Sequence, residues 1–231
     1  MTRRSIILSL FATFLALAIT PVRATDSHDY AKDEYAIIRD GLAPNKQMSL
    51  ASHGADENGV GEFHVWLMSE PAHRRIGRLP GIGPEGILDT GPGAYHASWS
   101  ADSRHAAVIY RSDRHIAELN IYEIAGNRAV QMSGPSLFKD VTSREPTADD
   151  DLRNSSPEFE WKGTRRFLLK ERRLFLTTDK GFAKMLGPYG RIGDDRGDGG
   201  FFVEFSAEAD CVLISGNRYR IVDLRVGKFG Q

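Results

Sequence analysis

Two strand-like runs are joined through a tight turn by the stretch Trp99-Ser100-Ala101-Asp102-Ser103-Arg104. This connection is the strongest indication of the fold in the sequence. Residues 106–110 are apolar and typical of a buried strand. After a polar tip at 111–115, residues 117–124 alternate as a half-buried strand does. A Gly126-Asn127 turn then leads into a fourth short run. The stretch therefore predicts four successive antiparallel strands.

The same order of strands and turns recurs along the chain. The turn between the first two strands of a unit favours residues that tolerate tight-turn geometry, and Asn45, Asp102 and Gly163 stand there. We predict four units, beginning at matched positions and covering residues 35–80, 94–133, 156–187 and 200–231. The matched positions are Leu42, Trp99, Trp161 and Phe205.

A single four-stranded unit cannot bury both of its faces, so several units should stack face to face. We therefore predict an all-β, propeller-like array of about four four-stranded antiparallel blades, as a small or incomplete ring. Trp99 and Trp161 occupy equivalent positions in two units and are expected to pack between blades. Trp66 falls outside that register and is a candidate for the mouth of a channel.

The segment from Trp99 to Arg104, together with Leu119-Asn120-Ile121-Tyr122-Glu123-Ile124, resembles the repeat signature of β-propeller proteins. It is similar to the repeats of Tol-associated periplasmic propellers and, more loosely, to WD repeats. Ala101 stands where that family prefers proline. The resemblance implies recognition of a protein or a small ligand rather than one particular chemistry.

The first 24 residues are typical of a secretory signal peptide. A basic start at Arg3 and Arg4 precedes an uncharged run over 6–20, and cleavage is expected after Ala24. The alternative is an uncleaved membrane anchor, although the run is shorter than the roughly 20 residues of a membrane span. We expect a periplasmic or secreted protein with a flexible segment at 25–34, including a possible short helix near 29–35, and one domain at 35–231.

Removal of residues 1–24 leaves 207 residues with 27 basic and 31 acidic side chains, a net charge of −4. This balance argues against binding to nucleic acid or to an anionic membrane, and we expect no stable membrane insertion. The single cysteine, Cys211, excludes a disulfide scaffold and lies in an apolar run, so we expect a buried, inert thiol.

The chain contains none of the common catalytic or nucleotide-binding motifs, and we predict no cofactor and no metal. The histidines lie between His28 and His115 without a short ligand spacing. The acidic, glycine-rich segment 194–200 could bind calcium, but Arg196 occupies a position where a ligand is needed. We interpret that segment as a solvated loop.

Three polar loops are the candidate contact sites for a ligand or partner, because exposed loops of variable length commonly carry recognition. The candidate residues are Asp56, Glu57, Asn58, Arg111, Asp113, Arg114, Asp194, Asp195 and Asp198. Two alternatives remain open. One is a periplasmic hydrolase or lyase with an axial site, in which Asp102 meets His96 or His105. The other is one part of a larger assembly whose exposed blade faces are completed by a partner.

Overall fold

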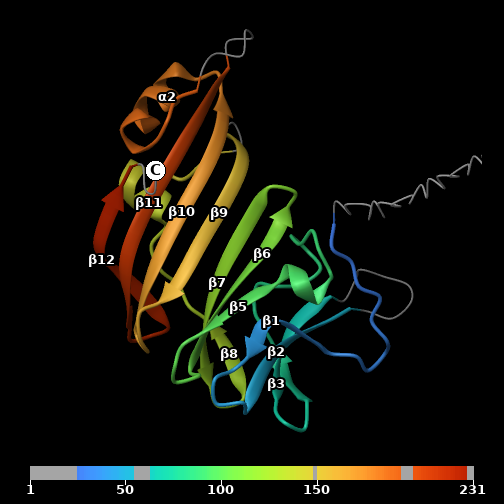
Figure 1. Ribbon diagram of the computed structural model, residues 1–231. Helices are drawn as coiled ribbons and strands as arrows, with labels where there is room; N and C mark the ends of the chain where they lie inside the picture. The colour runs from blue at the N-terminus through green and yellow to red at the C-terminus, as the bar shows by residue number, and fades with distance from the viewer. Residues whose placement is uncertain (1–24, 55–62, 148–149, 194–199, 228–231) are drawn as a thin grey trace, which may run out of the picture.

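The computed structural model describes residues 25–54, 63–147, 150–193 and 200–227. These residues form a predominantly β structure built on one large mixed sheet of 12 strands (Figure 1). The strand order is β12-β11-β10-β9-β7-β6-β5-β1-β2-β3-β4, with β8 paired to β7. Over the described ranges the sheet does not close on itself. The prediction of an all-β protein is therefore confirmed.

Three four-stranded antiparallel meanders make up the sheet, in chain order. The first contains β1 (Ala36–Leu42), β2 (Met48–His53), β3 (His64–Ser69) and β4 (Arg74–Arg78). The second contains β5 (His96–Trp99), β6 (His105–Asp113), β7 (Ile116–Ala125) and β8 (Arg128–Gln131). The third contains β9 (Asp151–Trp161), β10 (Arg166–Thr177), β11 (Phe201–Ile214) and β12 (Arg218–Val226). Short parallel pairings, β1 with β5 and β7 with β9, join them.

The prediction of separate third and fourth units is wrong, because both belong to the third meander. Phe205 lies inside β11 rather than at the start of a unit. Alternate residues of β11 from Val203 to Leu213 are buried. The period of two therefore continues through residues 206–210, which we interpreted as the turn after Phe205. That segment contains no glycine, proline or asparagine to end a strand.

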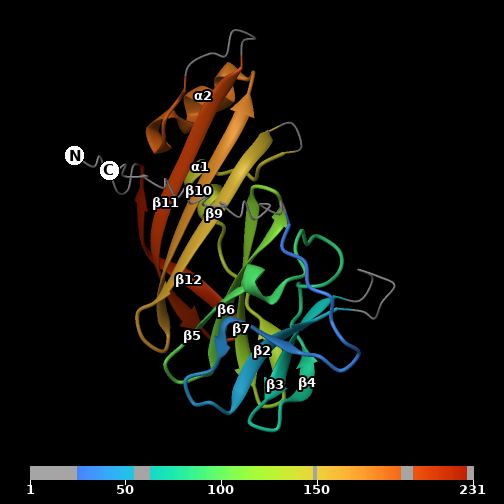
Figure 2. The same cartoon turned by 45° about the vertical axis from the view of Figure 1, so that its right-hand side comes forward.

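Two short helices cover part of the third meander, α1 (Leu137–Thr142) and α2 (Lys180–Leu186). Residues 183–186, whose sequence also suits a possible fourth strand of the unit 156–187, belong to α2. Asp179 caps this helix by accepting a hydrogen bond from the Gly181 N–H at 2.7 Å, and Phe182, Ala183 and Leu186 form its buried side. Figures 1 and 2 show α2 at the end of the third meander where the long strand β10 ends and the long strand β11 begins.

Residues 25–34 run along the first meander and contain a turn rather than the short helix considered from the sequence. Tyr30 is buried, and its hydroxyl lies 2.7 Å from the Ser52 hydroxyl and 2.6 Å from the Thr90 carbonyl. The Asp26 N–H donates to the Asp89 carboxylate at 2.7 Å. This segment is therefore hydrogen-bonded to the body of the molecule at several points.

The three meanders are structurally equivalent at the ends of their first strands. β1, β5 and β9 end at Leu42, Trp99 and Trp161, respectively. The Trp99 indole N–H donates to the Gly41 carbonyl at 3.0 Å, and the Trp161 indole N–H donates to the Ser98 carbonyl at 2.9 Å. Each tryptophan thus bonds to the residue that precedes the matched position in the preceding meander. The prediction that both pack between units is confirmed.

The second meander is buried on both faces, because it lies between the other two. Ala106 and Val108 of β6 pack with Leu50 and Val65 of the first meander. Ala107, the residue between them, packs into a second core with the third meander and both helices. The opposite faces of the first and third meanders point away from the stack, and we call these the two end faces.

Candidate functional site

Part of the predicted binding set lies outside the described residues. The residues concerned are Asp56, Glu57, Asn58, Asp194, Asp195 and Asp198. The other three, Arg111, Asp113 and Arg114, lie at or beside the hairpin between β6 and β7. Asp113 and Arg114 are exposed there, and the Asp113 carboxylate accepts the Arg114 N–H at 2.6 Å.

Arg111 joins that hairpin to the loop before β5. Its Nε and Nη2 donate to the two carboxylate oxygens of Asp89, each at 2.7 Å, and Asp89 is only 1% exposed. Hydrogen bonding to Asp89 raises the pKa of the Arg111 guanidinium. A bidentate pair with one partner buried holds two segments in register, so Arg111 has a structural role in addition to any contact it makes with a ligand.

The residues considered for catalysis make separate local contacts. Asp102 caps its own turn, because its Oδ1 accepts the Ser100 hydroxyl at 2.7 Å and the Arg104 N–H at 3.2 Å. His105 is half-buried, and burial lowers its pKa. His96 lies on the surface, where its Nε2 is 3.0 Å from Asp40 Oδ2. Within the described ranges, no group of three or more His, Cys, Asp or Glu side chains could hold a metal ion.

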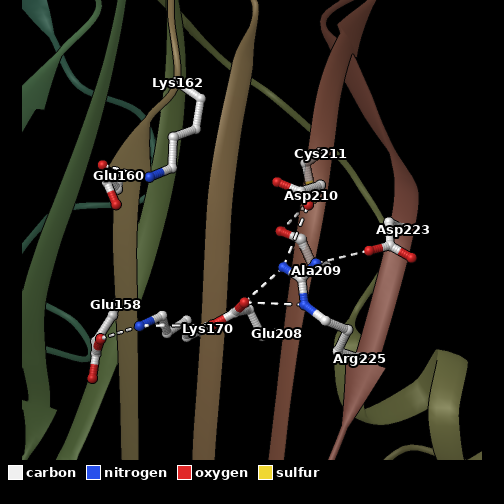
Figure 3. Close-up of polar contacts among 10 residues, drawn as sticks. All are labelled: Glu158, Glu160, Lys162, Lys170, Glu208, Ala209, Asp210, Cys211, Asp223 and Arg225. Carbon is white, nitrogen blue, oxygen red and sulfur yellow. Dashed lines mark hydrogen bonds and ion pairs between the residues drawn. The ribbon is translucent and has the colours of Figure 1, made fainter. Parts of the chain in front are cut away.

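The end face of the third meander carries a row of opposite charges across four strands (Figure 3). Glu158 on β9 lies opposite Lys170 on β10, Lys170 opposite Glu208 on β11, and Glu208 opposite Arg225 on β12. Lys170 Nζ is 3.5 Å from Glu158 and 3.7 Å from Glu208. Arg225 Nη2 is 2.6 Å from Glu208. We call this end face the ladder face.

The next row of the ladder face is acidic. Glu160, Asp210 and Asp223 occupy it, with Leu168 between Glu160 and Asp210. Asp210 and Asp223 lie directly opposite one another. Arg225 reaches both carboxylates, at 3.4 Å from Asp210 and 2.8 Å from Asp223. Like charges placed opposite one another destabilise a sheet, so Arg225 offsets a repulsion built into this face.

Stability alone does not account for the ladder face. Most of its charged side chains are well exposed, and exposed ion pairs typically contribute about 0–1 kcal/mol each. The charged residues drawn in Figure 3 comprise five carboxylates and three cations: Glu158, Glu160, Glu208, Asp210 and Asp223 with Lys162, Lys170 and Arg225. By strand register Arg166, Arg172, Arg218 and Arg220 lie on the same face, so it presents an ordered pattern of both charges to its surroundings.

A groove lies between the second and third meanders, beside the β9 edge of the ladder face. It has a volume of about 330 Å³ and is lined by side chains of β5, β6 and β9, including His96, Ile109, Glu158 and Phe159. Glu158 belongs both to this groove and to the charged row. The combination of apolar walls and charged margins is typical of surfaces that bind other molecules.

A second, smaller cavity of about 160 Å³ lies on the inner side of the third meander, between β7, β10 and the start of α1. Glu171 and Arg173 line it and form an ion pair. Burial raises the pKa of the Glu171 carboxyl, although Arg173 and the Phe138 N–H favour its charged form. We did not predict this pair from the sequence. The sequence signal for this pair is that Glu171 and Arg173 are charged residues at alternate, inward-facing positions of β10.

Cys211 is buried at 1% exposure, as predicted from its apolar run. Burial raises the pKa of its thiol to about 12. Because the thiolate is the reactive form, we expect the folded protein at pH 8 to react with a thiol reagent far more slowly than the unfolded chain. The measurement is the rate of labelling with and without denaturant, and equal rates would contradict the buried position.

No protein-family model matches the chain, and no curated protein shows significant similarity to it. Among the described residues, none of the helices is both long and apolar enough to cross a membrane.

Proposed function

We propose that this chain is a secreted or periplasmic, propeller-like binding and scaffolding protein. Its recognition surface is the ladder face, and its partner is a protein that presents cationic side chains next to apolar ones. The expected signal peptide supports the location. The stack of three meanders supports a propeller-like array of blades with open ends, which is the arrangement in which an end face remains available to a partner.

The observation that carries this proposal is the row of charges across β9, β10, β11 and β12. Its members come from strands up to 67 residues apart in sequence, from Glu158 to Arg225, yet they alternate in sign in exact cross-strand register. Complementary charge patterns set partner choice and association rate more than they add stability. A patterned face with little effect on stability therefore favours recognition.

The loops, our first candidates for recognition, remain the alternative location for the binding site. The two locations are distinguished by photo-crosslinking. One variant carries a benzoylphenylalanine in place of Leu168, in the middle of the ladder face. The matched variant carries it in place of Asp113, at the exposed tip between β6 and β7.

We expect an adduct of defined mass after irradiation of the position-168 variant in the secretory compartment, and none with the position-113 variant. An adduct at position 113 alone would assign recognition to the loops and contradict the proposal, as would the absence of any adduct at position 168. Circular dichroism of both variants checks that each is folded.

A further inference from the structure

Leu42 is a repeat position that faces no further meander among the residues that the structure describes. It ends β1 as Trp99 ends β5 and Trp161 ends β9. Each of those tryptophans packs against the preceding meander and donates to its backbone. Leu42 belongs to the first meander, and its side chain is 45% exposed. An apolar residue at this position suits contact with a further meander.

Other residues extend this exposed position into a surface. Ile37 lies on the same end face of the first meander and is 43% exposed. Beside it, the guanidinium groups of Arg75 and Arg78 lie over the Trp66 ring, at 4.7 and 5.1 Å from its centroid. Trp66 is itself buried beneath them, which corrects our suggestion that it lines a channel mouth. The first end face is thus apolar near β1 and cationic near β4.

Glu70, an acid on this cationic side, is held by contacts within the meander. Glu70 Oε1 accepts the Ser49 hydroxyl at 2.7 Å and lies 2.7 Å from His73 Nδ1. Arg75 and Arg78 lie beside it with their guanidinium groups over the Trp66 ring. Arg75 also donates to the Tyr35 hydroxyl at 3.1 Å, which orients its guanidinium over the face.

We infer that the first end face of one molecule packs against the ladder face of a second copy of this chain. The inference rests on the proposed function, since it names the partner of the ladder face. Three observations support it. Arg75 and Arg78 of the first end face can pair with the acidic row of the ladder face, Glu160, Asp210 and Asp223. The contact continues the stacking of meanders seen within one chain. It also provides a neighbour for Leu42 and Ile37.

Such a contact is heterologous, because two different surfaces meet. It closes into a ring if the rotation between copies permits, and otherwise builds an open chain of copies. Both outcomes share the same pair of faces, and the contact between those faces is what we propose.

The test is the mass of the purified protein in solution, measured by light scattering over a range of protein concentrations and at low and high salt. We expect species of two or more copies, and we expect high salt to weaken their association because exposed charges are screened. Leu42→Glu on one face and Asp210→Lys on the other should each weaken association at least about tenfold, which corresponds to roughly 1.4 kcal/mol. Ile192→Glu is the matched control, since Ile192 is 48% exposed and lies opposite Val203, whose side chain is buried on the inner side of the third meander.

Mixing the two defective variants gives the decisive result. Leu42→Glu keeps an intact ladder face and Asp210→Lys keeps an intact first end face, so a mixture should associate where neither variant alone does. Protein that remains monomeric at every concentration would overturn the inference, as would a loss of association in Ile192→Glu equal to that in Leu42→Glu.

The crosslinking experiment separates the two ideas. A monomeric protein that gives an adduct with a different protein at position 168 leaves the proposed function standing and overturns self-association. A monomeric protein that gives no adduct at position 168 overturns both.

Discussion

Trp161→Ala should lower the free energy of unfolding by about 3 kcal/mol, at the lower end of the range for removing a packed tryptophan. The indole contacts Phe159 and Phe167, with ring centroids 4.9 and 5.6 Å apart, and donates to the Ser98 carbonyl of the second meander. Its loss removes both the packing and the bond between two meanders. Chemical denaturation followed by circular dichroism measures the change.

Trp161→Phe is the matched control for this residue. It keeps an aromatic ring at the junction but cannot donate to Ser98, so we expect a loss of about 1 kcal/mol from the hydrogen bond and a further small loss from the reduced ring size. An alanine variant within about 1 kcal/mol of the original protein would mean that the junction does not depend on this residue, contrary to the stacking described here.

Glu171→Leu should destabilise the protein by about 3–5 kcal/mol, because it leaves a mostly buried arginine without its counter-charge. The Arg173 side chain is 18% exposed, and its guanidinium lies 5.0 Å from the centroid of the Phe138 ring. The Phe138 N–H loses its acceptor in the same variant. The equilibrium unfolding curve gives the magnitude.

The double variant Glu171→Leu with Arg173→Met tests the cause. Replacing both members of a buried ion pair by apolar residues of similar size is often neutral or stabilising. We therefore expect the second substitution to restore most of the stability lost in the first. If the double variant is less stable than Glu171→Leu by a further 1 kcal/mol or more, the two side chains contribute independently and the pair is not a coupled unit.

The first two meanders could be predicted from the sequence because local signals define them. Their turns begin directly after Leu42 and Trp99. In both turns, the fourth residue after the end of the strand has a positive φ, which is 56° at Lys46 and 58° at Ser103. Local backbone preferences of this kind are visible in a short window of sequence.

The third meander was divided in two because its central connection is long. Residues 178–200 between β10 and β11 include α2 and a glycine-rich, acidic segment. A connection with that composition is typical of a linker between units. Only the pairing of β10 with β11, which runs in register from Arg166–Val212 to Thr177–Phe201, shows that the two halves are one meander.

The ladder face could not be predicted for the same reason. The sequence shows Lys170 at the start of the charged run 170–173 and Glu208 between two alanines, and polar residues of this kind in a strand usually indicate a solvated face. Their opposition depends on the register between strands 38 residues apart. By contrast, the buried position of Cys211 depends on its own apolar neighbours, and it was predicted correctly.

The most direct test of the account is carboxylate footprinting of the ladder face. Glu158, Glu160 and Asp223 have side chains that are more than half exposed, at 55, 61 and 57%. Their labelling by a carbodiimide-coupled amine is compared between dilute purified protein and protein in its secretory compartment, with the exposed Asp113 as the internal control. We predict that the three ladder-face carboxylates become several-fold less reactive in the compartment while Asp113 does not change. Equal labelling of all four side chains under both conditions would contradict a binding function for this face.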